Sequence, residues 1–414
     1  MSVEKVIASA KVASSKLATA STVQKHAVLH SLASSLISNQ DLVLQANQLD
    51  LAKGELNGMA KGLLDRLRLT KERIIALSES VSEIISLTDP IGEVVSGKTL
   101  PNGLKISQVR VPFGVVGMIY EARPNVTVDI AALCIKSGNA ALLRGGSAAE
   151  ETNRVLVKLI QDVLSAANLP RDCVQTVDQY GREGAVALMQ ARGLVDVLIP
   201  RGSANLIKTV VEESKVPVIE TGDGIVHIFV DESADLDLAI PLILNAKVQR
   251  PSVCNSLETL LVHHAVADRL LPRLSSELTA SGVKVHACQR SIALMPEAEL
   301  ATESDWATEY LALELSVRVV DDLEGALAHI DHYSTNHTES ILTTNMANAE
   351  RFLNEVDSAV VMVNASTRFT DGGEFGFGAE VGISTQKLHA RGPMGLNALT
   401  STKWLVRGAG QVRS

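Results

Sequence analysis

The feature that most constrains the fold is a regular alternation between residues 115 and 240. Short apolar runs such as "VVGMIY", "AALLRGG" and "VDVLIPRG" alternate with longer segments of helical periodicity, such as "AAEETNRVLVKLIQDVLSAA". Strands that alternate with helices predict βαβ units around a parallel sheet, which is a Rossmann-like architecture. The series of expected strands continues through "VPVIETG" and "VHIFVD".

The flanking segments follow other patterns. Residues 2–87 repeat apolar positions every three or four residues, as in "HAVLHSLASSLI", and predict helices alone. The stretch "GLKISQVRVPFGVVGMIYE" predicts a strand pair leading into a buried strand. A second α/β series, including "SLETLLVH" and "ESILTTN", begins near residue 235. A chain of 414 residues is long enough for two α/β lobes, each with its own core.

Composition excludes several classes of partner. The formal net charge of −9 is spread along the chain without a basic stripe, which argues against nucleic acid or an anionic membrane as the main partner. No uncharged apolar run reaches the roughly 18 residues that span a bilayer, and no signal sequence is evident. We therefore expect a soluble, cytoplasmic protein. The four cysteines form no CxxC pair and have no zinc-like spacing, so neither a disulfide framework nor a metal site is expected.

One cysteine differs from the others in its surroundings. Cys134, Cys173 and Cys288 lie in apolar or strand-like runs, where a cysteine is usually structural. Cys254, in "NAKVQRPSVCNSLETLLVH", lies in a polar, proline-kinked segment before a strand, and its surroundings suggest a role beyond packing. Glu220 ends a very apolar strand. It is either a solvated strand-end acid or a carboxylate that faces Cys254 across a cleft between lobes.

Two strand-to-helix turns combine arginine, glycine and serine. Small residues at a helix start let a phosphate approach backbone N–H groups, and a neighbouring arginine can pair with it. A serine that caps the helix is the alternative explanation. The residues concerned are Arg144, Gly145, Gly146 and Ser147 in the first turn, and Arg201, Gly202 and Ser203 in the second.

Several motifs along the chain carry a resemblance to one family. They are "EARPNVTVD", "LLRGGS", "IPRGS", "ETGDGIVH", "RPSVCNSLETLLVH", "NHTESILTTN" and "FTDGGEFGFGAEVGISTQKLHARGPMG". In this order they resemble the gamma-glutamyl phosphate reductases of the aldehyde dehydrogenase superfamily, over essentially the whole chain. The resemblance implies NADPH-dependent reduction of L-glutamate 5-phosphate to L-glutamate 5-semialdehyde and phosphate, the second step of proline biosynthesis.

The resemblance also implies an aldehyde dehydrogenase-like α/β fold with three parts. Residues 1–100 and 119–235 would form a Rossmann-like NADPH-binding domain, and residues 236–370 a catalytic α/β domain. Residues 101–118 and 390–414 would form a small β oligomerisation arm. The resemblance implies that the chain assembles with further copies of itself in a dimer or tetramer. It also implies functional coupling to a glutamate kinase.

Residue roles carry over from the resemblance position by position. Cys254 matches the nucleophile that forms a thioester, and Asn125 matches the asparagine that helps form the oxyanion hole. Glu220 matches the superfamily's general base. Arg144 and Ser147 match positions that meet the adenosine ribose and its 2′-phosphate.

Other interpretations stay open on the sequence alone. An NAD(P)-dependent aldehyde dehydrogenase that oxidises a small aldehyde to a carboxylate would have the same fold. A scaffold, or a thiol-dependent transferase without a nicotinamide cofactor, is a third interpretation. Lys387, His389 and Arg391 either hold an anionic group of the substrate or brace a domain interface.

Overall fold

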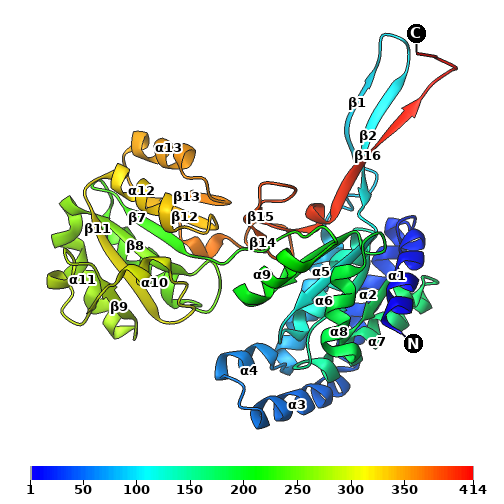
Figure 1. The fold of residues 1–414 in the computed structure, drawn as a ribbon, viewed down its shortest axis with the longest axis horizontal. Helices are drawn as coiled ribbons and strands as arrows, with labels where there is room; N and C mark the ends of the chain where they lie inside the picture. The colour runs from blue at the N-terminus through cyan, green and yellow to red at the C-terminus, as the bar shows by residue number, and fades with distance from the viewer. Residues whose placement is uncertain (1, 414) are drawn as a thin grey trace. The chain divides into compact units, whose positions relative to one another are not determined.

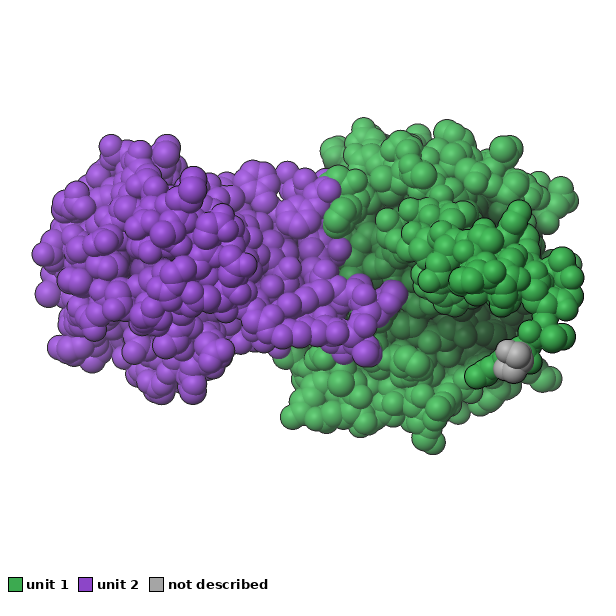
Figure 2. Space-filling model, turned by 90° about the horizontal axis from the view of Figure 1, so that it is seen from above, with its two compact units in different colours: residues 1–221, 376–382, 394–414 green, residues 222–375, 383–393 purple. Residues whose placement is uncertain are grey.

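The computed structural model describes residues 2–413, and the chain divides into two compact units (Figure 2). Unit 1 comprises Met1–Thr221, Gly376–Gly382 and Met394–Ser414, and unit 2 comprises Gly222–Phe375 and Ile383–Pro393. The chain therefore first passes from unit 1 to unit 2 after Thr221, earlier than the expected domain boundary at residue 235. As a result "VHIFV" opens the sheet of unit 2 rather than closing that of unit 1. No helix within residues 2–413 is long and apolar enough to cross a membrane.

Unit 1 is built on a four-stranded parallel sheet in the order β5-β4-β3-β6, as the alternation predicted (Figure 1). The strands are β3 (Val115–Tyr120), β4 (Ala140–Arg144), β5 (Val174–Thr176) and β6 (Val197–Arg201). The expected strand "VPVIETG" is absent from residues 2–413 as a strand. It contributes one isolated bridge between Leu198 and Val218. Pro217 has no N–H to donate, so the segment leaves the edge of β6 after this short contact.

Helices cover both faces of this sheet. Val115 and Ile119 face a core that α1, α8 and α9 share, whereas Tyr120 points to the other face, where its hydroxyl lies 2.6 Å from that of Thr127 in α6. The alternation follows from the period-two geometry of a strand. The helices of unit 1 are α1 (Val3–Leu17), α2 (Thr22–Ser38), α3 (Gln40–Leu56), α4 (Lys61–Leu67), α5 (Lys71–Ser86), α6 (Pro124–Lys136), α7 (Glu150–Ala166), α8 (Gly181–Gln190) and α9 (Ala204–Glu213).

A separate antiparallel sheet in the order β1-β2-β16 extends from unit 1. Its strands are β1 (Val94–Thr99), β2 (Lys105–Pro112) and β16 (Thr400–Arg407). The sequence indicated β2 but not β1. The strand pair expected within "GLKISQVRVPFGVVGMIYE" does not form a hairpin. Instead β2 pairs with β1 and β16, while β3 enters the parallel sheet. The arm therefore begins before residue 101.

Unit 2 contains a seven-stranded parallel sheet in the order β10-β9-β11-β8-β7-β12-β13. All residues of β7, β8 and β12 are buried, as expected for a parallel sheet with helices on both faces. The strands are β7 (Val226–Val230), β8 (Leu257–His263), β9 (Lys284–Ala287), β10 (Glu299–Leu300), β11 (Glu314–Val320), β12 (Thr338–Leu342) and β13 (Val360–Val363). The short strands β14 (Ile383–Ser384) and β15 (Gly392–Pro393) pair with each other.

The two faces of this sheet pack against different helices. Ile228 and Leu260 lie in a core with α10 (Leu236–Val248) and α11 (His264–Ala280). Phe229 and Leu261 face α12 (Leu323–Tyr333) and α13 (Met346–Glu355) on the other side. Neighbouring residues of one strand thus belong to different cores, which fixes the register of the sheet.

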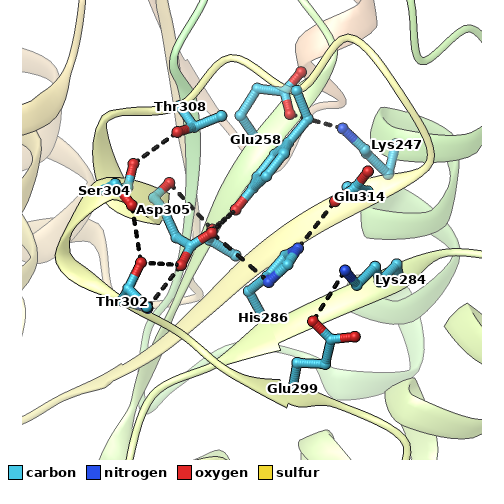
Figure 3. Close-up of polar contacts among 12 residues, drawn as sticks. Lys247, Glu258, Lys284, His286, Glu299, Thr302, Ser304, Asp305, Thr308 and Glu314 are labelled. Atoms are coloured by element: carbon cyan, nitrogen blue, oxygen red, sulfur yellow. Dashed lines mark hydrogen bonds and ion pairs between the residues drawn. The ribbon is translucent and has the colours of Figure 1, made fainter.

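An ion pair lies inside the first of these cores. Lys247 of α10 donates to Glu258 of β8 at 2.8 Å, and both side chains are fully buried (Figure 3). Burial raises the pKa of Glu258 to about 7, although the charge of Lys247 opposes that shift. Burial likewise lowers the pKa of Lys247. Each charge is therefore stabilised in the core mainly by the other, although Glu314 and Glu309 also favour the charge of Lys247.

We predict that Lys247→Met lowers the free energy of unfolding by ~3 kcal/mol, because it leaves a buried carboxylate without its counter-ion. The double variant Lys247→Met/Glu258→Gln should recover much of the loss, since no uncompensated charge remains. Differential scanning calorimetry of both variants measures the effect. Lys158→Met, which removes the exposed ion pair with Asp162, is the control and should change stability by less than ~1 kcal/mol. If Lys247→Met were as stable as the wild type, the buried ion pair between Lys247 and Glu258 would not contribute to stability as proposed.

Candidate active site

Cys254 lies in a turn of unit 2 between α10 and β8. The amide of Ser256 donates to the carbonyl of Val253 at 3.0 Å and closes the turn. Cys254 is half-buried and forms no disulfide with another cysteine of the described residues. Because the fully buried strand β8 begins at Leu257, the turn is anchored at its end by the core of unit 2.

The loop before β7 touches this turn through main-chain atoms. A Cβ placed on Gly224 would lie 1.5 Å from the carbonyl oxygen of Cys254 and 2.9 Å from its Cα. Both neighbouring atoms belong to the backbone, so no change of rotamer would relieve the overlap. Only glycine allows this approach.

Side chains from two other segments hold the same loop in place. The amide of Gly224 donates to Oε1 of Glu309 at 2.8 Å, and the amide of Ile225 donates to the hydroxyl of Thr335 at 3.0 Å. That hydroxyl in turn donates to the carbonyl of Asp223 at 2.5 Å. Burial raises the pKa of Asp223. Glu309 and Thr335 therefore fix the loop at Gly224, which in turn contacts the backbone of Cys254.

The segment that carries Glu309 is itself fixed by a polar cluster (Figure 3). The hydroxyl of Tyr310 donates to Asp305 at 2.8 Å and lies 2.9 Å from the hydroxyl of Ser316. His286 stacks on the Tyr310 ring, with centroids 5.2 Å apart, and its Nε2 lies 3.0 Å from Glu314. Burial raises the pKa of the Tyr310 hydroxyl. The position of Glu309 thus depends on contacts with β9 and β11.

An arginine distant in sequence reaches the residue next to Cys254. Arg368 donates through Nη1 to Oδ1 of Asn255, and through Nε to Gln249 at 2.9 Å. Burial and the neighbouring charge of Arg250 lower the pKa of Arg368, while the charges of Asp371 and Cys254 oppose this shift. Cys254 therefore lies within electrostatic range of a half-buried guanidinium.

The three other cysteines have structural surroundings. Cys134 and Cys173 are buried, and burial raises the pKa of each thiol to about 12. For Cys288 burial acts in the same direction, but hydrogen bonds from Ser291 and backbone amides outweigh it and lower the pKa. Its sulfur accepts from the Ser291 hydroxyl at 3.2 Å. Cys288 is thus held by internal hydrogen bonds.

Asn125, the expected oxyanion donor, lies in unit 1 in the first turn of α6. Its side chain is exposed, and its Nδ2 donates to Oδ2 of Asp129 at 3.3 Å. Burial raises the pKa of Asp129, while the charge of Arg201 opposes the shift. The amide of Asn125 is therefore presented at the start of a helix, and its role toward an oxyanion stays a prediction.

The glycine turn after β4 is filled by a carboxylate that the sequence analysis missed. Gly145 and Gly146 donate their amides to Oδ1 of Asp178 at 2.7 and 3.2 Å, and Asn153 donates to Oδ2 at 3.0 Å. These two amides serve the protein's own anion rather than remaining for a phosphate. The side chain of Arg144 differs, because its Nε is buried without a hydrogen-bond partner among residues 2–413.

The start of α7 is also occupied from within unit 1. Asp50 of α3 accepts from the amides of Glu151 and Thr152 at 3.2 and 2.8 Å, and from the Thr152 hydroxyl at 2.6 Å. Burial raises the pKa of Asp50, while these hydrogen bonds oppose the shift. A carboxylate at a helix start stabilises the helix as a phosphate would. Ser147, just before this helix, is exposed.

The second turn agrees with the helix-cap alternative. The side chain of Ser203 accepts from the amide of Leu206 at 3.4 Å and caps α9. Gly202 lies beside it. Arg201 donates to the carbonyl of Val381 at 2.8 Å and pairs with Glu380 at 3.7 Å. These contacts hold elements of unit 1 together, and a role in cofactor binding stays a prediction for all three turn residues.

Cations near the C-terminus form contacts within unit 2. Lys387 pairs with Asp357, and Arg391 pairs with the same carboxylate at 2.9 Å. The Arg391 guanidinium also donates to the carbonyl of Asp357 at 2.7 Å. The structure therefore gives Lys387 and Arg391 a bracing role inside unit 2.

The expected site residues divide between the units. Cys254 belongs to unit 2, whereas Asn125 and Glu220 belong to unit 1. Glu220 is half-buried and lies just before the crossing at Thr221, so its approach to Cys254 stays a prediction. The sequence analysis missed Gly224, Glu309 and Arg368. Gly224 has a visible signal, since it lies in the glycine-rich "ETGDG", and Arg368 lies in "NASTRFTDGG", at the start of a motif that carries the resemblance. Nothing local marks Glu309.

We predict that Gly224→Ala abolishes turnover and destabilises unit 2, because the added methyl group would overlap the main chain of Cys254. Steady-state activity and calorimetry measure the two effects. The control is Gly62→Ala on α4, where the added methyl group meets nothing within 4 Å. It should leave activity unchanged and should not lower stability, since alanine favours helix. Normal activity of the Gly224→Ala enzyme would overturn the close-approach argument.

Comparisons with known proteins place the chain in a family. The family model described as "Aldehyde dehydrogenase family" matches residues 1–292. Gamma-glutamyl phosphate reductase of Leifsonia xyli subsp. xyli is 64% identical over 98% of this chain and 96% of that protein. The protein of the same name from Thermobifida fusca is 57% identical over 99% of this chain and 98% of its own.

Solved structures agree with this placement. The crystal structure of gamma-glutamyl phosphate reductase from Thermotoga maritima matches with a TM-score of 0.96 and 44% identity over the full length of both chains. An acetylating aldehyde dehydrogenase from Geobacillus thermoglucosidasius matches with a TM-score of 0.72 at 16% identity, covering 100% of this chain and 97% of that one, which shows the shared fold alone. This chain therefore belongs to the aldehyde dehydrogenase family and, within it, to the gamma-glutamyl phosphate reductases.

Proposed function

We propose that the protein reduces L-glutamate 5-phosphate to L-glutamate 5-semialdehyde and phosphate with NADPH, in proline biosynthesis. The observation that carries this proposal is the 64% identity to a gamma-glutamyl phosphate reductase over 98% of the chain. The setting of Cys254 supports it, because the residue is only half-buried and its backbone is held closely by Gly224. A nucleophile needs that combination of access and fixed position.

The chemistry begins with attack of the Cys254 thiolate on the acyl carbon of the substrate. A bond forms between Sγ and this carbon, and the bond to the phosphate oxygen breaks, which leaves a thioester and free phosphate. Negative charge develops on the carbonyl oxygen during the attack. Preorganised donors stabilise such a charge by about 3 kcal/mol each. We assign this role to the side-chain amide of Asn125 and the backbone amide of Cys254.

The residues of unit 1 fit a nicotinamide cofactor. The buried Nε of Arg144 has no hydrogen-bond partner among residues 2–413, and it lies at the carboxyl end of a parallel strand, where such folds bind ligands. When bound, the cofactor supplies the hydride that reduces the acyl group. We propose NADPH, with Arg144 and Ser147 at its 2′-phosphate.

Glu220 has a reduced role in this scheme. A general base that activates water would hydrolyse the thioester, whereas the acyl group must be preserved until it is reduced. We therefore propose Glu220 as a site residue that does not activate water during the reaction. Phosphate, not water, is the acyl partner.

We also propose that the arm of unit 1 joins copies of the chain in a dimer or tetramer. Its edge strands expose large apolar side chains, namely Val94, Trp404 and Val406 at 62, 55 and 59%. Exposed edges with apolar residues favour pairing with another chain. Coupling to a glutamate kinase and a cytoplasmic location remain predictions from the sequence.

The reverse reaction separates the proposed function from aldehyde oxidation. With semialdehyde and NADP⁺ but no phosphate, we expect about one NADPH per active site and then a stall, because the site excludes the water that would release the acyl group. Addition of phosphate should restart turnover. Absorbance of NADPH in a stopped-flow instrument measures both phases.

The controls for this experiment test the nucleophile. Cys254→Ser should show neither phase, because no base is dedicated to activating its hydroxyl. Cys173→Ala should retain both phases. Steady formation of NADPH and glutamate without phosphate would show that the protein is an aldehyde oxidiser.

A second prediction concerns cofactor choice. Arg144→Ala should weaken NADPH binding by about tenfold or more, as expected for loss of charge-assisted hydrogen bonds, and NADH binding much less. Fluorescence titration of both cofactors measures the difference. Arg154→Ala, which changes an exposed arginine of α7, is the control and should affect neither. Equal weakening of both cofactors would show that Arg144 acts structurally.

A further inference from the structure

Two arginines flank the Cys254 turn in unit 2, because Arg368 donates to Gln249, the residue before Arg250, and to Asn255, the residue after Cys254. Arg250 follows the end of α10, and Arg368 lies in the short 3₁₀ helix Thr367–Phe369. The positive charge of each acts on the other, because Arg250 lowers the pKa of Arg368. Among residues 2–413 neither arginine forms an ion pair with a carboxylate, although the chain contains many such pairs elsewhere.

Arg368 is held in place by hydrogen bonds from its guanidinium to neutral side chains, and the charges of Asp371 and Glu374 act on it without forming an ion pair within the described part of the chain. Its Nε and Nη1 donate to the neutral side chains of Gln249 and Asn255. Asn255 is locked in turn, since its Nδ2 donates to the carbonyl of Thr370 at 2.8 Å and its own carbonyl accepts from the Thr367 hydroxyl at 2.8 Å. The guanidinium is therefore oriented by the residue next to Cys254.

A half-buried cation of this kind is costly unless an anion shares the site. Burial is the largest influence that lowers the pKa of Arg368, and the nearby Arg250 adds to the cost. Two guanidinium groups that form no ion pair can bind a doubly charged anion, because their planar forks match phosphate oxygens. Arg250 is exposed, so such an anion can reach the pair from solvent.

We propose that Arg368 and Arg250 bind the phosphate group of the acyl phosphate and stabilise it as it leaves. This inference rests on the proposed function. The substrate also carries an α-carboxylate, but that group lies several bonds away from the carbon that Sγ attacks. The phosphate is attached directly to that carbon. An arginine bound to the neighbour of Cys254, within electrostatic range of the thiol, is placed for the nearer anion.

The step balances without a further reactant. Sγ forms a bond with the acyl carbon, the bond between that carbon and the phosphate oxygen breaks, and its electron pair stays on the leaving phosphate. The two guanidinium groups offset this charge, so no acid is needed. In the reverse direction an oxygen of the bound phosphate attacks the thioester and the thiolate leaves.

The reverse reaction measures phosphate binding separately from acylation of Cys254. For Arg250→Gln and Arg368→Gln we expect the KM for phosphate to rise about ten- to a hundredfold, the range of charge-assisted hydrogen bonds. The KM for semialdehyde and the NADPH burst without phosphate should stay close to wild type, because acylation from the aldehyde involves no phosphate. Arg273→Gln, on the surface of α11, is the matched control and should change neither constant.

Other outcomes would overturn the proposal. A raised KM for semialdehyde with an unchanged KM for phosphate would assign the arginines to the α-carboxylate. Loss of the burst with unchanged phosphate dependence would show that Arg368 acts on the thiol alone. If Arg368→Gln fails to fold, Arg250→Gln still tests the proposal. Arg250 is exposed, so its replacement should not disturb folding. Steady turnover of the wild type without phosphate would instead refute the proposed function.

Discussion

The main-chain contact between Gly224 and Cys254 is the constraint on which the candidate active site depends. It exists because the loop and the turn precede neighbouring parallel strands, β7 and β8, whose residues are entirely buried. The cores on both faces of the sheet hold these strands in register, and the register brings the two backbones together. Glu309 and Thr335 then occupy the loop's amides, so the backbone near the thiol has little freedom to move.

Internal carboxylates occupy many of the backbone donors that a ligand would otherwise use. Asp178 fills the glycine turn after β4, Asp50 fills the start of α7, and Glu309 accepts from the loop before β7. Each keeps a local backbone conformation rigid without any bound ligand. Anionic ligands must then be recognised mainly by side chains. Arg144 in unit 1 and Arg368 in unit 2, which form no ion pair with a carboxylate among residues 2–413, are suited to that task.

Much of the architecture was predictable because it rests on local periodicity. The helices before residue 87, the parallel series from β3 to β6 and the second series from β8 to β13 follow from patterns within single segments. The sequence patterns failed to predict which sheet a strand joins and whether a segment becomes a strand by pairing with a distant one. "VHIFV" has the same pattern whichever sheet it joins, and β1 is a fully exposed edge strand that forms by pairing with β2.

The sequence by itself determined the fold class, the family and the identity of the candidate nucleophile, because periodicity, motif order and the unusual setting of Cys254 are properties of contiguous residues. Only the tertiary structure decided what surrounds that cysteine. Glu309 and Arg368 are distant from it along the chain, and nothing in the local sequence of either shows that it lies near Cys254. They reach its neighbourhood because parallel β-strands bring the segments at their ends together at the edges of a sheet, which no local pattern encodes.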